Sequence, residues 1–236
     1  AVVNFLTTPG GENRLRPGRA EFIDTTATSA TSVVSLSANP IIAATVFRGE
    51  VFMVGDDRTL YRIDGMKRMT SLSSGGTTTL IDGSAVPTFA EDSQRLVIAG
   101  GGVLQTWVPG EVNSKRLVTD PPSDTVNYDV PRATHVCSIG LYLVINDIRD
   151  KHRFQWSKIG DGVHTLYPML AYNTADAKPD EVTAVRENGR ELFVFGQRSV
   201  QVYNVIGDPT LPFVVASNLS VGCTATQSII ETDTAF

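Results

Sequence analysis

VTAVRENGRELFVFG, residues 182–196, contains two short apolar and β-branched runs separated by a polar turn. This is the pattern of a β-strand, a tight turn and a returning strand. The same pattern occurs three times upstream, at residues 45–55, 88–100 and 134–145. The first apolar residues of the four returning strands are Val51, Leu96, Leu141 and Leu192. Their spacings of 45, 45 and 51 residues indicate a repeat architecture.

Each hairpin pattern is followed by a third strand-like run, at residues 59–63, 103–108, 153–156 and 199–203. The spacing leaves room for a fourth strand in each unit, which is typical of the blades of a β-propeller. One such sheet cannot bury both of its faces alone, so blades stack around an axis. The sequence therefore predicts an all-β, β-propeller-like array of antiparallel blades over residues 41–236. A β-sandwich or an irregular β-solenoid stays open as the alternative.

Side chains two residues apart in a strand share one face of the sheet. We therefore predict that the four aligned residues are buried together with the residues two positions on, Met53, Ile98, Leu143 and Val194. Strands are predicted near residues 42–48, 50–55, 95–99, 134–138, 140–145, 182–186 and 191–195. The one helix candidate is residues 172–177, ahead of Pro179. A fifth, incomplete unit begins at Ser228, and we expect the natural chain to continue beyond Phe236.

The composition is that of a globular protein, with 42% apolar and 19% charged residues among 236. The formal net charge of −5 argues against a free-standing nucleic-acid or membrane-surface binder, because such proteins normally carry a basic excess. No run of about 18 apolar residues is present, so the sequence predicts no membrane span.

Residues 1–40 lack the repeat, and we predict an extended N-terminal arm that packs on the blades or reaches a neighbouring molecule. Its turn-rich beginning carries Arg14, Arg16 and Arg19, which are the candidate interaction residues. Their guanidinium groups could contact DNA phosphates or an acidic partner surface. A solvated arm is the simpler interpretation.

Few groupings could carry catalysis, and no GxSxG, HExxH or P-loop motif occurs. His135 lies two residues before Cys137, so the two share a strand face and could form a base and a nucleophile. No orienting acid is marked, and a buried core pair is the favoured interpretation. The three glycines at residues 100–102 could surround a phosphate, but they lie between two strands with no helix after them, which favours a turn.

The remaining metal and redox candidates also favour structural interpretations. Cys137 and Cys223 are far apart and outside any metal-ligand spacing, so we expect both to be free and buried. Acidic residues gather at turns, where Asp is favoured without any ion: Asp56 with Asp57, Asp147 with Asp150, and Asp161. The sequence therefore predicts no catalytic residue, no cofactor and no metal site.

Five motifs in the C-terminal half resemble, in their order, the packaged-DNA stabilisation proteins of short-tailed bacteriophages, also called tail accessory or nozzle proteins. The motifs are FQWSKIGDG at 154–162, ADAKPDEV at 175–182, GRELFVFGQRSVQVY at 189–203, GDPTLPF at 207–213 and GCTATQS at 222–228. Tyr61 and its neighbours fit an earlier strand of that family more loosely. One departure is Gln201, which stands where the family has an acid.

The resemblance implies a structural, non-enzymatic virion protein that contains a β-propeller and is assembled in the host cytoplasm. Such proteins form a ring, usually a hexamer, below the portal, where they contact portal-adaptor or other tail proteins. They extend the tail tube and help to retain packaged double-stranded DNA, which passes through the lumen without sequence-specific binding. Two other functions stay open, a propeller enzyme acting on glycans and a monomeric interaction propeller.

The net charge leads to a further prediction about that lumen. Each Lys or Arg bound to a phosphate adds affinity for DNA that is independent of sequence, and such contacts would hold DNA that has to leave the capsid. We therefore predict a lumen that is not basic, with Arg14, Arg16 and Arg19 facing a neighbouring subunit or an adjacent tail protein.

Overall fold

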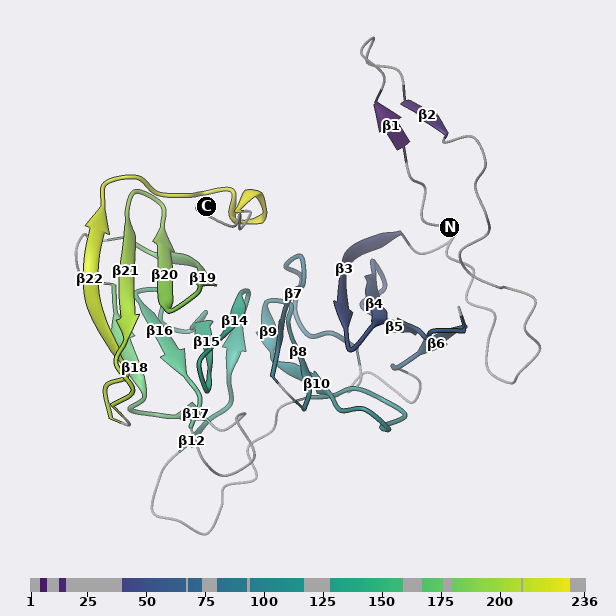
Figure 1. Ribbon diagram of the computed structural model, residues 1–236, viewed down its shortest axis with the longest axis horizontal. Coiled ribbons are helices and arrows are strands. Elements are labelled where there is room, and N and C mark those ends of the chain that lie inside the picture. Colours follow the sequence, from purple (N-terminus) through teal and green to yellow (C-terminus); the bar gives the residue numbers. More distant parts are fainter. Residues whose placement is uncertain are drawn as a thin grey trace.

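In the computed structural model, the described residues form four consecutive antiparallel sheets of four strands each, which we call blades 1 to 4, and three two-stranded pairs (Figure 1). The structure describes residues 5–7, 13–15, 40–66, 68–73, 80–92, 94–116, 128–158, 167–175, 180–208 and 210–229. Apart from a 3₁₀ turn at Thr226–Ser228, the regular elements in these residues are strands. No helix in the described ranges is long and apolar enough to cross a membrane. The prediction of an all-β, β-propeller-like fold is confirmed.

In each blade every strand pairs with the next one of its unit along the chain. Blade 1 contains β3 (Ile41–Phe47), β4 (Glu50–Gly55), β5 (Leu60–Ile63) and β6 (Met69–Ser71). Blade 2 contains β7 (Thr88–Glu91), β8 (Leu96–Ala99), β10 (Gln105–Trp107) and β11 (Lys115–Arg116). Blade 3 contains β14 (Val136–Ile139), β15 (Tyr142–Asn146), β16 (Arg153–Trp156) and β18 (Tyr172–Thr174). Blade 4 contains β19 (Val182–Asn188), β20 (Glu191–Gly196), β21 (Val200–Val205) and β22 (Phe213–Leu219).

Three two-stranded pairs lie outside the blades. β9 (Gly102–Val103) pairs with β13 (Arg132–Ala133), and β12 (Tyr128–Asp129) pairs with β17 (Tyr167–Pro168). Near the N-terminus, β1 (Phe5–Thr7) pairs with β2 (Asn13–Leu15). The predicted strands and third strands match the observed ones within about two residues.

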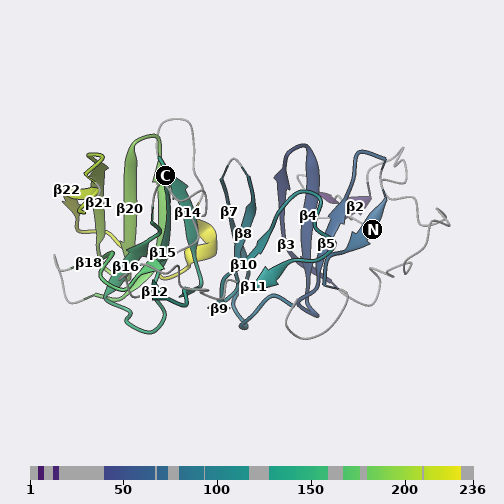
Figure 2. The ribbon, with the colours of Figure 1, turned by 90° about the horizontal axis from the view of Figure 1, so that it is seen from below.

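The first strands of neighbouring blades contact one another, β3 with β7, β7 with β14 and β14 with β19. They therefore form the inner edge of the array, and the fourth strands β6, β11, β18 and β22 form the outer edge. Figure 2 shows the blades as successive upright sheets in a row. This arrangement is the stacking expected of propeller blades.

Alternating side chains of each blade pack against the two neighbouring blades, because successive residues of a strand point to opposite faces. Phe52 and Val54 of blade 1 pack with Leu96 and Ile98 of blade 2. The other face of blade 2, with Val97 and Ala99, packs against Leu143 and Ile145 of blade 3.

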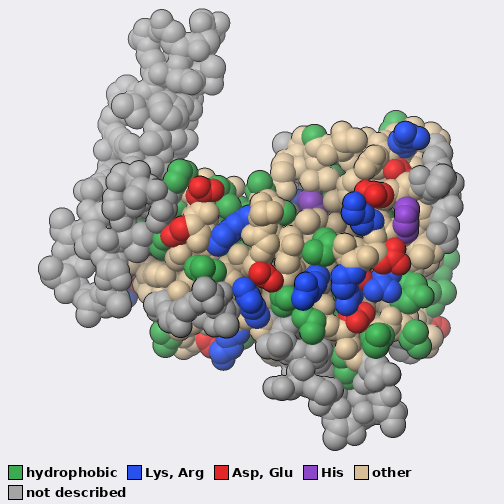
Figure 3. Space-filling view, turned by 180° about the vertical axis from the view of Figure 1, so that it is seen from behind, with side chains coloured by type: hydrophobic (Ala, Val, Ile, Leu, Met, Phe, Trp, Pro, Cys, Tyr) green, Lys and Arg blue, Asp and Glu red, His purple; other side chains and the backbone are tan. Residues whose placement is uncertain are grey.

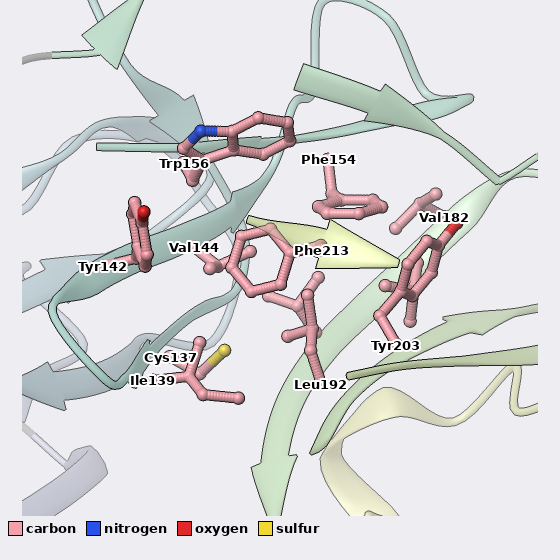
Figure 4. Close-up of a cluster of buried hydrophobic side chains, with 12 residues drawn as sticks. Cys137, Ile139, Tyr142, Val144, Phe154, Trp156, Val182, Leu192, Tyr203 and Phe213 are labelled. Atoms are coloured by element: carbon pink, nitrogen blue, oxygen red, sulfur yellow. The ribbon is translucent and has the colours of Figure 1, made fainter. Parts of the chain in front are cut away.

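The interface between blades 3 and 4 is rich in aromatic rings (Figure 4). The ring centroids of Phe154 and Tyr203 are 4.9 Å apart in an edge-to-face arrangement. The ring centroids of Trp156 and Phe213 are 5.4 Å apart, and Phe213 comes from the fourth strand of blade 4. Leu192 and Val194 complete the interface, so β20 faces blade 3 through the two residues that the alignment selected.

Seven of the eight predicted core residues are at least half-buried, and one is not. Leu141 is 62% exposed, so its predicted burial is wrong. Gly140 has a φ of +60° in the turn that joins the paired residues Ile139 and Tyr142, so the returning strand begins at Tyr142, one residue after Leu141. Leu143, two positions on, occupies the buried place.

The helix predicted at residues 172–177 is also wrong, because Tyr172–Thr174 is strand β18. Its residues pair with Arg153, Phe154 and Gln155 of β16 and complete blade 3. The aromatic and β-branched residues of this segment suit a strand, and pairing with β16 outweighs the weak local preference of a short segment for helix.

Each of the two end blades has one face that packs against no other described blade, and these two faces carry opposite sets of the alternating positions. On blade 1 these are Val51 and Met53, which cluster with Tyr61 and Ile63. On blade 4 they are Phe193 and Phe195, which cluster with Val200, Cys223 and Ile229. The chain after β22 crosses this face of blade 4, where the Cys223 N–H donates to the carbonyl of Gly196. Residues 230–236, which make up most of the predicted fifth unit, lie outside the described residues.

Candidate functional site

His135 and Cys137 lie where β14 meets β19 at the inner edge, and both are buried. Burial, reinforced by the nearby Glu187 carboxylate, raises the pKa of the Cys137 thiol well above its ordinary value. Burial and the positive charge of Arg186 lower the pKa of His135 to about 4. An activated pair needs a thiolate beside an imidazolium, which requires the opposite shifts. At neutral pH both groups are uncharged, and the core-pair interpretation fits them.

A groove of about 510 Å³ lies beside this pair, between the first strands of blades 2, 3 and 4. Its charged lining consists of Glu91, Arg186 and Glu187, so acidic groups outnumber basic ones. A site for phosphate groups would need an excess of cationic or N–H donors. The inner edge of these three blades therefore does not form an anion site.

The glycines at residues 100–102 form a packed crossing of two backbone segments. A Cβ atom on Gly83 would lie 2.3 Å from the carbonyl carbon of Gly101, and one on Gly102 would lie 2.5 Å from Cγ of Asp82. The side chain of Asp82 accepts the N–H of Val103. Close packing, not phosphate binding, accounts for the three glycines, as the turn interpretation predicts.

The acidic residues have partners within the protein. Both carboxylate oxygens of Asp57 accept hydrogen bonds from Thr59, and the Tyr61 hydroxyl donates to one of them. Asp150 accepts the N–H of His152. Asp161 lies outside the described residues, and within those residues no three His, Cys, Asp or Glu side chains gather as metal ligands.

Asp147 is the centre of an ion-pair network on the loop after β15. Its side chain is fully buried and bonded to the guanidinium groups of Arg149 and Arg153, with N–O distances of 2.9 and 2.8 Å. Burial opposes ionisation, but the hydrogen bonds from Arg149 and Arg153 outweigh it and lower the pKa of Asp147. Asp129 completes the network, because one of its carboxylate oxygens lies 3.1 Å from a guanidinium nitrogen of Arg149. The two guanidinium groups, of Arg149 and Arg153, neutralise the two carboxylates, of Asp129 and Asp147. The network therefore fixes the loop and has no excess negative charge to bind a cation.

The arginines predicted as interaction residues belong to the arm. Arg14 lies in β2 and pairs with Leu6 of β1. Arg16 and Arg19 lie outside the described residues. Both cysteines are free, as predicted; Cys137 is buried and Cys223 is half-buried.

The outer side of blades 3 and 4 is the feature that the sequence analysis did not single out. Of the fourteen large hydrophobic side chains exposed in the described residues, nine lie between residues 169 and 221. They are Met169, Leu170, Tyr172, Ile206, Leu211, Val214, Val215, Leu219 and Val221. We call this set the apolar rim. Figures 1 and 2 place β18 and β22, which carry four of these residues, side by side at one end of the array. Residues 209–230 contain no charged residue, and this run was the available signal.

The rest of the visible surface is of mixed charge. Figure 3 shows several Lys and Arg side chains close together on the back of the blades, with Asp and Glu side chains beside them. Individual pairs account for part of this pattern, such as Lys151 with Glu181 at 3.3 Å. On this face, the Asp and Glu side chains beside the Lys and Arg side chains weaken their attraction for phosphate.

Several solved structures match the chain with TM-scores below 0.5. They include the computationally designed Ika8 protein, with a TM-score of 0.49 and 14% identity over 77% of this chain and 50% of that one. PorZ of the type-IX secretion system of Porphyromonas gingivalis matches with a TM-score of 0.48 and 14% identity, over 71% of this chain and 20% of that one. Kluyveromyces lactis Hsv2p matches with a TM-score of 0.48 and 14% identity, over 75% of this chain and 50% of that one. The chain thus spans half or less of the length of these three structures. No curated protein matches the sequence.

One family model matches most of the chain. It is described as "Phage_stabilise: Bacteriophage P22 Gp10, beta-propeller", and it matches residues 34–236. The match covers all four blades and begins shortly before β3. The chain therefore belongs to the Bacteriophage P22 Gp10 β-propeller family of phage stabilisation proteins.

Proposed function

We propose that the chain is a structural protein of a phage tail that assembles as a ring of six copies below the portal. There it extends the tail tube and helps to retain packaged DNA. Family membership supports a structural role in a virion. The ring, its position and the retention of DNA are the proposal.

The apolar rim is the observation that carries the proposal. Large exposed apolar areas on a soluble protein mark surfaces that another molecule covers. Four of the nine rim residues lie on the outer strands β18 and β22, and the other five lie in the segments that flank them in the sequence. These two strands are at one end of the array, opposite blade 1. A contact surface at one end favours assembly through unlike surfaces, and such contacts close into rings when the rotation between copies permits.

The charges of the chain favour retention of DNA without strong binding of DNA by the protein. The groove at the inner edge is lined by more acidic than basic groups, and the formal net charge of the chain is −5. DNA that passes such a surface releases few counterions and gains little affinity. We therefore assign retention to closure of the channel by the assembly and its tail partners. Arg14, Arg16 and Arg19 then serve contacts between proteins.

Mass photometry of the purified chain, alone and mixed with portal–tail complexes, tests the ring. We expect one oligomer of defined mass that binds to the portal end of the complex. A chain that stays monomeric in both conditions contradicts the proposal and favours an interaction propeller. Release of reducing sugars from host glycans by the purified chain would instead support a glycan-acting enzyme.

A further inference from the structure

Strand β22 ends blade 4 with an unusually long free edge. It has seven residues, and among the strands that the structure describes it pairs with β21 alone. The corresponding outer strands β6, β11 and β18 have three, two and three residues. A free edge presents a row of backbone N–H and C=O groups that can pair with another strand.

The side chains of β22 do not protect this edge. Phe213 is buried, and the six residues after it are exposed, with Val214 at 42%, Val215 at 48% and Leu219 at 44%. Proteins usually guard long edges with charged residues such as Lys, with Pro or with a β-bulge. Strand β22 contains no charged residue and no Pro, and its pairing with β21 has one register shift, opposite Val202 and Tyr203. Its length, exposure and lack of charge therefore suit it to receive a further strand.

The hairpin β1–β2 is a second incomplete sheet in the same chain. It has only two strands, and three residues of each are paired. Isolated two-stranded hairpins are at best marginally stable in water and gain stability when a further strand joins them. Strand β1, Phe5–Thr7, carries no charged residue, whereas β2 contains Arg14. An uncharged strand can pair with β22 without desolvating a charge, so β1 is the better donor.

We propose that β1 of one copy adds to the outer edge of β22 in the neighbouring copy and extends the sheet of blade 4. This is strand addition, in which backbone hydrogen bonds provide affinity and alternate side chains provide specificity. Figure 1 places β1 and β22 at opposite ends of the molecule, which favours pairing between copies over pairing within one. Such a contact is head-to-tail, and repeated contacts of this kind close into a ring when the rotation between copies permits.

The connection between the hairpin and blade 1 sets how far β1 can reach. Residues 16–39 connect the hairpin to blade 1, and 24 residues span at most about 80 Å when extended. The inference rests on the ring proposed above and names the surfaces that join its subunits. It also places Arg14 beside a neighbouring subunit, as proposed for the arm.

Crosslinking tests the pairing directly. Two versions of the full chain, both with Cys223→Ser, carry either Leu6→Cys or Ala216→Cys, and the remaining Cys137 is buried. When the two are mixed and joined with a short bifunctional maleimide, we expect a covalent dimer with a peptide linking positions 6 and 216. Val112→Cys in place of Ala216→Cys is the control, since Val112 is 76% exposed on blade 2. Equal yields of the covalent dimer with Ala216→Cys and with Val112→Cys would overturn the inference.

Assembly of variants separates this inference from the proposed ring. Deletion of residues 1–15 and Val215→Lys should each convert the ring to monomers with unchanged β-sheet circular dichroism, while Val112→Lys should leave the ring intact. If the unmodified chain forms no ring, the ring proposal fails and this inference fails with it. If the ring forms and survives the deletion, the ring stands and the pairing is wrong, whatever Val215→Lys does.

Discussion

At the residue scale, two leucines selected by the same repeat alignment differ completely in burial. Leu192 is fully buried between blades 3 and 4, and Leu141 is 62% exposed in a turn. Leu192→Ala should lower the free energy of unfolding by about 2–5 kcal/mol, because it removes buried methyl groups and leaves a cavity. Leu141→Ala should change it by less than about 0.5 kcal/mol. Urea denaturation of both variants measures this, and equal losses would contradict the register of the blades.

His135 should make stability depend on pH. Its pKa is about 4 in the fold, below the ordinary value of 6.5, because burial and Arg186 disfavour its cation. The unfolded chain therefore binds a proton more readily, so the contribution of His135 is complete above pH 6.5 and declines as the pH falls toward 4. The difference between these two pKa values corresponds to a loss of roughly 3 kcal/mol in the free energy of unfolding once the pH is below both.

His135→Gln tests this dependence. The variant should lose much less of its free energy of unfolding between pH 6.5 and 4.5 than the unmodified chain loses. Urea denaturation at several pH values within this interval gives the slopes. Parallel slopes would show that His135 is accessible to protons in the fold.

At the residue scale the sequence could predict which positions share a face. Leu96 and Leu192 each lie on the face of their blade that packs against the preceding blade, and Val51 lies on the equivalent face of blade 1. This follows because successive side chains of a strand point to alternate faces with a strict period of two. The exposure of Leu141 could not be predicted from that period. It depends on where the Gly140 turn ends, and the boundary of an element is set by local backbone geometry.

At the element scale, Asp180 holds the turn between β20 and β21. Its carboxylate accepts the backbone N–H groups of Gln197, Arg198 and Ser199 and the Ser199 hydroxyl, at 2.6–3.1 Å. Burial opposes ionisation, but these donors outweigh it and lower the pKa of Asp180. Its contribution is therefore present above the ordinary pKa of 3.8 and is lost as the pH falls through the lower value in the fold.

Asp180→Ala should lower the free energy of unfolding by about 1–3 kcal/mol, because it leaves three N–H groups, including that of the buried Ser199, without their acceptor. Asp180→Asn keeps one acceptor oxygen and should cost less. Asp150→Ala is the control, since Asp150 accepts a single exposed N–H group. Urea denaturation at pH 7 ranks the three, and a loss for Asp150→Ala as large as that for Asp180→Ala would contradict this role.

The sequence predicts repeated elements better than single ones. Three strands of every blade follow a pattern that recurs four times, and all were found from it. Fourth strands recur poorly, since they have from two to seven residues, and their identity depends on pairing with a third strand. This is why β18 was predicted as a helix and β22 was not singled out.

At the scale of the whole molecule, the arm arginines distinguish contacts between proteins from contacts with DNA. Reversal of Arg14, Arg16 and Arg19 to Glu should weaken ring assembly or docking to tail proteins, because three changes of sign disrupt complementary surfaces. The affinity of the chain for double-stranded DNA should remain unchanged. Mass photometry and a filter-binding assay measure the two properties.

The reverse outcome would overturn the proposed role of the arm. Normal assembly combined with leakage of genomes from variant virions would mean that these arginines hold the DNA directly. The matched control is reversal of Arg48 and Arg68, which lie on turns of blade 1, with Arg68 ion-paired to Asp64 at 2.7 Å. That control should leave both assembly and genome retention unchanged.

Electron cryo-microscopy of intact virions tests the central claim most directly. The account predicts a ring below the portal in which every subunit contains blades 1 to 4, with the apolar rim covered by a neighbouring copy. It also predicts a channel lined without excess Lys or Arg. Density for the chain as isolated monomers, or a ring in which the rim faces solvent, would contradict the account.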